Sequence, residues 1–296
     1  RQKASSGGVG LELGFEALDN NNQVCGVRYN VEKGRAEHFI ATSKEEIIQT
    51  TGSKYIQSYT IDGFKDIDLK KNYLVTGTPC QIDSFRRYLQ MRHKEDNFLL
   101  MDFFCHGVPS MLMWKKYCQL NERKIGKLIY LSWRDKQTGW HDSWSMDLEG
   151  KNGKIKTWFS KGDIFYKLFL GDYCMNKACF KDCKYKYDNS AADIRIGDFW
   201  GDTYAKDEDG VSALIAFTSK GKNVIEKLED RCQLIEHPFE IVAEGQMQNN
   251  CGVAFLSPIA WNLLKSSKFV SSNKWNLLFK CEAVLHLPQR IIRKMI

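Results

Sequence analysis

Three stretches of the chain contain cysteines where a metal centre could form. "GTPCQI" (77–82) and "FFCHGVPS" (103–110) each carry one cysteine directly after an apolar run, and "CMNKACFKDCKY" (174–185) carries three. Iron–sulfur clusters and structural zinc sites both need several converging thiolates, commonly with two on one tight loop. Two strand-end and two loop cysteines would supply the four thiolates of a 4Fe-4S cluster. The candidate ligands are Cys80, Cys105, Cys179 and Cys183, with Cys174 as the alternate loop ligand.

The same cysteines are also compatible with sites that carry no iron–sulfur cluster. The loop spacing permits a metal site but also fits three unrelated cysteines, and a single cysteine at a strand end is more often a buried core residue. A closed structural zinc site would use the same thiols without redox chemistry. A catalytic pairing of Cys105 with His106 is not favoured, because adjacent side chains of an extended segment point in opposite directions. We expect the other thiols in the core: Cys25, Cys118, Cys232, Cys251 and Cys281.

"ASSGGVG" (4–10) could bind an anion. Two hydroxyls followed by two glycines expose backbone N–H groups, which form a phosphate site if a helix follows. Apolar residues at every second position from Val9 to Phe15 fit a strand after a flexible terminal loop equally well. The candidate residues are Ser5, Ser6, Gly7 and Gly8.

"SWRDKQTGWHDSW" (132–144) concentrates basic and aromatic side chains. Arg134 and Lys136 lie close in sequence to the indole of Trp140. Such groups suit a flavin or another planar, anionic cofactor through stacking and charge-assisted hydrogen bonds. The alternative is the solvated end of a hairpin.

The elements that must position these residues alternate between strand and helix patterns. Apolar runs bounded by turn residues predict strands, and the spacing of Ile82, Phe85 and Leu89 predicts one face of a helix. Ser43 with Glu46 has capping-box spacing, and Ser110 could cap a further helix. The predicted strands are 23–30, 36–42, 72–77, 97–105, 192–197 and 212–218, with a last helix of this alternation at about 220–230.

Two sections depart from this alternation. Three strand candidates between about 127 and 159, two of them joined across Asn152 and Gly153, predict an inserted antiparallel section. From about residue 240 the chain reads as helical, including "PIAWNLLK" and "PQRIIRKMI". We therefore predict an α/β fold with a mixed sheet, divided into a main domain at 1–239 and a helical C-terminal extension at 240–296.

Composition narrows the class of protein. With 296 residues, 43% hydrophobic and 27% charged, the chain can bury a large core, and no apolar run is long enough for a membrane span. Neither a signal peptide nor a disulfide scaffold is indicated, so we expect a cytoplasmic protein. The net charge of +7 is scattered, which does not indicate a nucleic-acid partner. Because the chain starts without Met, we expect a segment upstream of Arg1.

Seven motifs in order resemble the coenzyme F420 hydrogenase/dehydrogenase beta subunit family. The resemblance covers about residues 1–225. Two positions depart from the usual pattern: the loop cysteines are spaced C-x3-C, which keeps Cys174 as a rival ligand, and Ser190 stands where an arginine is usual. The motifs are "ASSGG", "GSKYIQS", "GTPCQI", "CHGVPS", "RDKQTGW", "ADIRIGDFWG" and "DGVSALIAFTSKG".

The resemblance implies an electron-transfer module that carries FAD and a 4Fe-4S cluster and exchanges electrons with a deazaflavin coenzyme (F420) or with ferredoxin. It also implies a redox partner protein of the hydrogenase/dehydrogenase type and an N-terminal ferredoxin-like segment before Arg1. Similar chains occur in bacteria near polysaccharide genes, so a cofactor-less member acting as a binding subunit is the alternative. The implied flavin-binding residues are Ser5, Ser6, Gly7 and Gly8, with Lys54, Tyr55 and Ser58, and the implied cluster ligands are Cys80, Cys105, Cys179 and Cys183.

Overall fold

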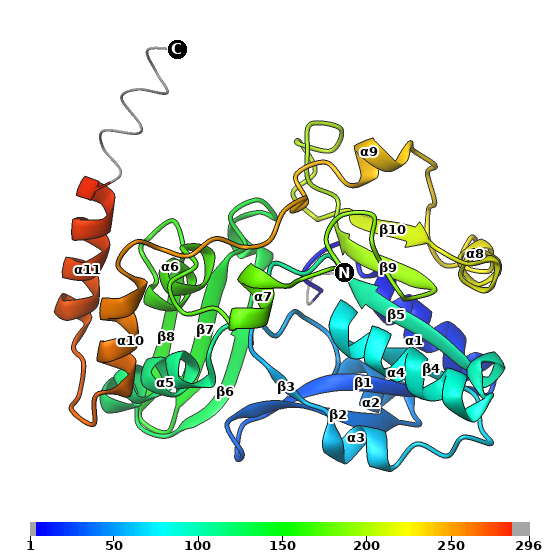
Figure 1. Ribbon diagram of the computed structural model, residues 1–296, viewed down its shortest axis with the longest axis horizontal. Coiled ribbons are helices and arrows are strands. Elements are labelled where there is room, and N and C mark those ends of the chain that lie inside the picture. Colours follow the sequence, from blue (N-terminus) through cyan, green and yellow to red (C-terminus); the bar gives the residue numbers. More distant parts are fainter. Residues whose placement is uncertain (1–3, 286–296) are drawn as a thin grey trace.

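The computed structural model describes residues 4–285. Within that range the strands form a seven-stranded mixed sheet and a separate three-stranded antiparallel sheet, which lie on opposite sides of the view in Figure 1. The large sheet has the order β10-β9-β5-β4-β1-β2-β3, with β1 (Gln23–Asn30), β2 (Arg35–Ala41), β3 (Ser58–Tyr59), β4 (Tyr73–Thr76), β5 (Phe98–Phe103), β9 (Ile194–Asp198) and β10 (Ser212–Ala216). The small sheet contains β6 (Leu128–Trp133), β7 (Ser145–Gly150) and β8 (Gly153–Trp158). The α/β class with an antiparallel insertion is confirmed.

The centre of the large sheet is parallel. Strands β1, β4, β5 and β9 run in one direction, whereas β2 and β10 are antiparallel to their neighbours β1 and β9. The carboxyl ends of β4, β5 and β9 therefore meet at one edge of the sheet. Ligands of open α/β sheets bind at this kind of edge.

Local sequence rules explain the helices that leave this edge. Helix α4 (Pro79–Arg92) follows β4 directly, with Pro79 in its first turn and a capping box between Thr78 and Gln81. Its face of Ile82, Phe85 and Leu89 is buried, as predicted. Helix α5 (Met111–Ile125) begins where the Ser110 side chain accepts a hydrogen bond from the backbone N–H of Leu112.

Helix α1 (Val9–Asp19) settles the ambiguity at the N-terminus. The segment after Gly8 is a helix and not a strand, and it buries Val9, Leu13 and Ala17 at helical spacing. Gly14 lets it pack closely on α2 (Lys44–Ile48), since a Cβ at Gly14 would lie 2.9 Å from the side chain of Ile47. The helix that an anion site requires is therefore present.

The two faces of the large sheet bury different helices. Val24 and Leu74 point to the face covered by α1 and α2, whereas Cys25 and Val75 point to the face covered by α4, as strand alternation requires. A further core surrounds the small sheet. The remaining helices are α3 (Ile61–Lys65), α6 (Ile164–Leu170), α7 (Lys177–Lys181), α8 (Ser219–Glu226), α9 (Phe239–Val242), α10 (Ser257–Lys265) and α11 (Ser272–Leu285), with 3₁₀ turns at Glu95–Asn97 and Lys136–Thr138.

The C-terminal part is helical, as expected. Helix α10, which contains "PIAWNLLK", packs on α5, and α11 packs on α6 beside the small sheet. The predicted helical segment at 288–296 lies outside the described residues. None of the helices in the described part of the chain is long and apolar enough to cross a bilayer. The division at 239/240 stays a prediction.

Candidate functional site

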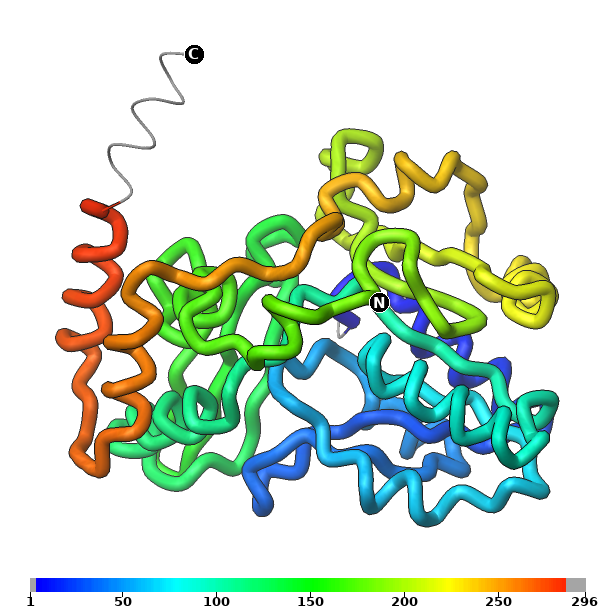
Figure 2. The backbone as a smooth tube through the Cα atoms, viewed as in Figure 1, coloured from blue at the N-terminus to red at the C-terminus, as the bar shows by residue number. Residues whose placement is uncertain are grey.

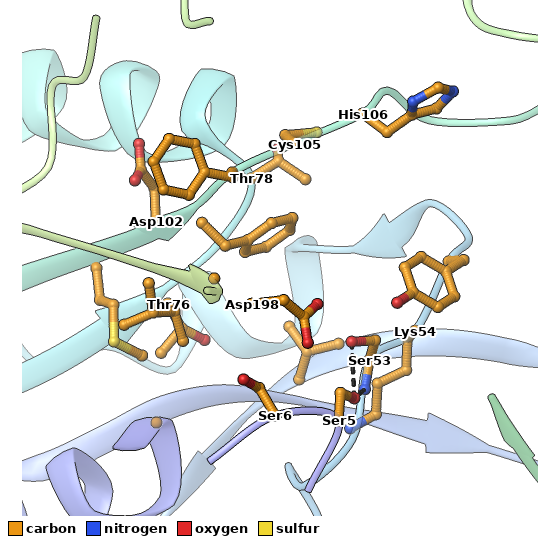
Figure 3. A pocket seen from close by; sticks show the side chains of 18 of the residues that line it. Ser5, Ser6, Ser53, Lys54, Thr76, Thr78, Asp102, Cys105, His106 and Asp198 are labelled. Atoms are coloured by element: carbon orange, nitrogen blue, oxygen red, sulfur yellow. Dashed lines mark hydrogen bonds between the residues drawn. The ribbon is translucent and has the colours of Figure 1, made fainter. Parts of the chain in front are cut away.

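A cavity of about 480 Å³ lies at the carboxyl edge of the parallel strands. It is bordered by the ends of β4, β5 and β9, by the N-terminal loop and by the 50–58 loop, and its far wall includes Trp144 and Phe169 of the small-sheet half. Figure 3 shows Ser5, Ser6 and Lys54 around the same space as Cys105 and Asp198. This size is typical of a site for a small molecule or cofactor.

The N-terminal loop and the start of α1 line the cavity through Ser5, Ser6, Gly8 and Val9. Gly8 caps α1 in the left-handed conformation, with φ of 100°, and no side chain of the described residues caps this helix end. Gly7 admits no side chain, because a Cβ there would lie 2.9 Å from the backbone nitrogen of Ser212. The two hydroxyls are used to fix the loop: Ser5 Oγ accepts a hydrogen bond from Ser53 N at 2.8 Å, and Ser6 Oγ donates to the carbonyl oxygen of Val211. An uncapped helix N-terminus of this kind can bind an anion.

Arg134 and Lys136 support this loop from outside the cavity. Arg134 Nη2 donates to the carbonyl oxygen of Ser5 at 2.9 Å, and Lys136 Nζ donates to that of Ser6 at 2.8 Å. Neither side chain is among the described residues that line the cavity. Both were predicted to bind a cofactor, and the structure has them hold the loop that borders the cavity.

The predicted group of Lys54, Tyr55 and Ser58 lines the cavity. Lys54 Nζ donates to the carbonyl oxygens of Thr50, Thr51 and Gly52 at 2.6–2.9 Å. The side chain therefore stabilises the conformation of the loop to which it belongs. Burial lowers the pKa of Lys54 to about 7. Ser58 Oγ accepts a hydrogen bond from Gln81 of α4, which links this loop to the helix that carries Cys80.

An aromatic wall continues from Tyr55. Its ring stacks on Trp144 with centroids 5.3 Å apart, and Trp144 stacks in turn on Trp200 at 6.3 Å. The guanidinium of Arg134 lies over the Trp144 ring at 4.8 Å. All three aromatic residues line the cavity and offer flat surfaces to a planar ligand. The sequence analysis did not assign Trp144 or Trp200 to the site, although Trp200 lies in the "DFWG" motif.

The thiols of the predicted cluster come from α4, the end of β5 and the α7 loop, and of these four described residues only Cys105 lines the cavity. Cys80 is exposed in the first turn of α4, Cys105 follows β5 and lines the cavity, and Cys179 and Cys183 come from the α7 loop. Burial raises the pKa of the Cys105 thiol to about 12, Lys186 opposes this rise, and the thiols of Cys179, Cys80 and Cys183 add to it.

Backbone pairing holds the two cysteine segments together. The amide of Asn176 donates to the carbonyl of Val108 at 2.8 Å, and Val108 N–H points to the sulfur of Cys179 at 3.4 Å. Lys186 Nζ then donates to the carbonyl oxygens of Cys105 and His106, at 2.6 Å and 2.8 Å. Lys186, which the sequence analysis missed, therefore ties the end of the cysteine loop to the strand-end cysteine.

A buried ion pair holds residues 187–190, the segment that follows the cysteine loop. Arg195 of β9 and Asp102 of β5 are both fully buried and 2.7 Å apart, and Ser190 donates a hydrogen bond to Asp102. Arg195 also donates to the carbonyl oxygens of Tyr187 and Asn189. Ser190 stands where the resembled family usually has an arginine. Here Ser190 donates to Asp102, and Arg195 supplies the arginine that pairs with this carboxylate.

Cys174 is set apart from the other candidate ligands. Its side chain is fully buried in the core around the small sheet, and burial alone raises its pKa to about 12. Among the described residues, no three His, Cys, Asp or Glu side chains are grouped so that they could hold a metal ion as they stand. All ten cysteines are free; Cys281, expected in the core, is exposed.

Comparisons with known proteins agree with this architecture. Residues 70–241 match the family model for the C terminus of the coenzyme F420 hydrogenase/dehydrogenase beta subunit, and residues 1–62 match the model for its N terminus. A chain in a xenon-derivatised structure of the F420-reducing NiFe hydrogenase complex from Methanosarcina barkeri is similar in fold, with a TM-score of 0.54 and 17% identity over 88% of this chain and 82% of that chain. No curated protein matches the sequence.

Proposed function

Since the chain belongs to the coenzyme F420 hydrogenase/dehydrogenase beta subunit family, we propose that it is an electron-transfer subunit that binds FAD and one 4Fe-4S cluster. It passes electrons between a reduced carrier, coenzyme F420 or ferredoxin, and a redox partner of the hydrogenase/dehydrogenase type. The similar fold in an F420-reducing hydrogenase complex supports the assembly with partner subunits. Ten free thiols suit the reducing cytoplasm.

The cavity has the features that a flavin dinucleotide requires. The uncapped N-terminus of α1 would bind the pyrophosphate through its backbone N–H groups, with Gly8 at the cavity wall allowing its close approach. Gly7 instead lets the loop pack against the backbone of Ser212. The aromatic wall would lie against a planar ring, and Arg134 keeps that wall and the loop in register. The residues proposed to contact FAD line the cavity: Ser5, Ser6, Gly8, Lys54, Tyr55 and Ser58. Gly7, Arg134 and Lys136, which do not line it, are proposed as positioning residues.

The thiol set has the chemistry that a 4Fe-4S cluster requires. Cys80, Cys105, Cys179 and Cys183 would hold it, each losing its proton on binding iron. When bound, a flavin exchanges two electrons with a hydride donor and single electrons with a cluster, and the protein supplies position and environment. Burial around Cys105 and the cation of Lys186 are the two features of this chain that would set the environment of the cluster.

One observation carries the proposal: Cys105 lines the cavity, and the loop that follows it is hydrogen-bonded through Val108 to the segment that carries Cys179. The two cofactor sites would therefore share a wall, as direct electron transfer requires.

The test is anaerobic purification of the chain followed by an absorption spectrum, metal and sulfide analysis, and flavin release. We expect a brown protein with flavin bands that bleach on reduction, and with iron and sulfide in equal amounts. A colourless protein with stoichiometric zinc, or one that fails to bind added FAD, would contradict the proposal. Cys105→Ala should lose the iron, whereas Cys118→Ala, which removes a thiol from α5, should keep it.

A further inference from the structure

A segment without regular secondary structure, residues 245–253, forms one wall of the cavity. It lies between α9 and α10, and its residues Gly245, Gln246 and Met247 line the cavity. Figure 2 shows this segment in orange, crossing from α9 on the large-sheet side to α10 on the small-sheet side. Because the cavity is lined by residues of both halves, the segment bridges the two halves beside the space that a ligand would occupy.

The chain is fixed on either side of this segment. Before it, the carboxylate of Glu244 accepts a hydrogen bond from the backbone N–H of Asp202. After it, the hydroxyl of Ser257 at the start of α10 donates to the carbonyl oxygen of Tyr173 at 2.6 Å. The segment can therefore move while both flanking parts of the fold stay in place.

One hydrogen bond ties the segment to each half of the molecule. Gln246 Nε2 donates to the carbonyl oxygen of Asp198, at the end of β9, at 2.6 Å. The backbone N–H of Gly252 donates to Oδ2 of Asp172 at 2.7 Å. Within the described part of the chain, no backbone–backbone hydrogen bond joins residues 247–253 to another residue. A segment with so few backbone bonds opens at a lower free-energy cost than the sheets and helices around it.

The side chains of the segment show what its opening would expose. Cys251 is 3% exposed and packs in the core around the small sheet, and Met247 is partly buried against the same core. Gly245 has a φ of 75°, and an added Cβ there would lie 2.8 Å from the Cβ of Trp200. Since glycine accommodates a wide range of φ, Gly245 can serve as a bend at which the segment leaves the aromatic wall. Outward motion about this bend would uncover Cys251.

We propose that residues 245–253 form a lid that opens to admit the cofactor and closes over it, with Gln246 as the positioning residue that latches the lid to β9. The identity of the cofactor, FAD, rests on the proposed function, whereas the opening itself does not. In the closed position Met247 both lines the cavity and packs against the small-sheet core, so the lid completes the wall between the two halves. Lids of this kind exclude water and set the rates at which a ligand enters and leaves. The lid lies outside the segments matched by the family models, which end at residue 241.

The reaction of Cys251 with N-ethylmaleimide measures the opening and needs no variant. In the metal- and ligand-free chain, with modified peptides mapped by mass spectrometry, Cys251 should react more than about tenfold faster than Cys25, which is fully buried in β1 and is reached only on global unfolding. Saturating FAD should slow the reaction of Cys251 and leave that of the exposed Cys281 unchanged. Equal rates at Cys251 and Cys25, or a Cys251 rate that bound FAD does not change, would overturn the inference.

Removing the latch tests the role of Gln246. Gln246→Ala should raise the reaction rate of Cys251 about fivefold, the factor expected for one lost hydrogen bond. In stopped-flow fluorescence, FAD should associate and dissociate faster by the same factor with an unchanged Kd, because the same hydrogen bond holds the lid shut with and without ligand. The matched control Gln248→Ala changes an exposed glutamine of the same segment and should alter none of these rates.

Two results of this comparison overturn the inference. One is an equal effect of the two substitutions. The other is faster dissociation of FAD from Gln246→Ala with an unchanged association rate, which would make Gln246 a ligand contact and not a latch. A wild-type chain that binds no FAD would instead overturn the proposed function, and the Cys251 rates of the ligand-free wild type and latch variant would still decide whether the segment opens.

Discussion

Arg134 and Asp198 form a two-pronged ion pair under the N-terminal loop. Nη1 of Arg134 lies 3.1 Å from Oδ2 of Asp198, and Nη2 lies 3.2 Å from Oδ1. The remaining N–H groups of Arg134 donate to Ser5, Tyr55 and Ser143. Since a guanidinium has five N–H donors, this side chain has none left for a ligand. Arg134 therefore connects the loop, the aromatic wall and the end of β9.

Replacing Arg134 should damage both stability and flavin binding. We expect Arg134→Gln to lower the free energy of unfolding by about 3 kcal/mol, because Asp198 is left partly buried without its partner. Arg134→Lys should recover only part of this loss, since an ammonium group cannot reproduce the fork. Urea unfolding and fluorescence titration with FAD measure the two effects. Arg87→Gln, which breaks an exposed pair with Asp83, is the control and should change neither quantity.

Gly8 and Gly34 allow backbone strain to be separated from the binding role. Both have positive φ, 100° and 62°, and neither has a neighbour closer than 3.8 Å to an added Cβ. Each substitution to Ala should therefore lower the free energy of unfolding by about 1–2 kcal/mol through strain alone. Only Gly8→Ala should also weaken FAD binding, because Gly8 orients the first N–H groups of α1. Equal flavin affinity in the two variants would contradict the assignment of the α1 terminus.

Replacing Lys186 should lower the stability of the fold, the iron content of the chain and the reduction potential of the cluster. Lys186→Met removes hydrogen bonds from a buried cation to the carbonyl oxygens of Cys105 and His106, at a cost of about 2 kcal/mol in unfolding free energy. We expect less iron per chain and, in the fraction that retains iron, a more negative reduction potential, because a nearby positive charge is lost. Lys184→Met makes the same charge change on an exposed residue two positions away and should leave iron content unaltered. Identical iron contents in the two variants would remove Lys186 from the site.

Elements set by local rules were predictable from the sequence. Helix α4 was expected from the spacing of Ile82, Phe85 and Leu89, and the structure adds a Thr78–Pro79 start to it. Such short-range features act regardless of the rest of the fold. The segment after Gly8 was ambiguous, because Val9, Leu11 and Leu13 also alternate as in a strand. Packing of α1 on the sheet and on α2 decides for the helix, and that contact is not visible in a short window.

The sequence predicted many residues of the candidate site, but it did not predict what their side chains contact. Arg134 was expected to contact a cofactor, but all of its N–H groups donate to protein atoms. The acceptors lie 129, 64, 79 and 9 positions away in sequence, in Ser5, Asp198, Tyr55 and Ser143. Lys186 carried no local signal, since the carbonyl oxygens of Cys105 and His106 to which it donates lie 81 and 80 positions away in sequence. Spacing arguments detect thiols on one loop, whereas thiols joined only by tertiary contacts need the fold.

The stability of the fold should depend on the protonation of His38. His38 is 1% exposed on β2, and burial lowers its pKa to about 4, although its Nε2 lies 3.0 Å from the carbonyl oxygen of Thr76. In the unfolded chain the pKa is 6.5, so between pH 6.5 and 4 the unfolded state binds the proton and the folded state does not. Stability therefore falls as the pH drops through this window, by up to about 3 kcal/mol. Glu37, whose pKa is lowered to about 2, adds a further loss of stability only as the pH falls from about 4.5 to 2.

Urea unfolding at a series of pH values tests this dependence. The loss between pH 6.5 and 4 should appear in the wild type and in His93→Asn, which changes an exposed histidine at the end of α4. His38→Gln keeps a donor for Thr76 but cannot titrate, so its stability should be nearly flat between pH 4.5 and 6, below the range in which Lys54 titrates. A slope in this window equal to that of the wild type would show that another group is responsible.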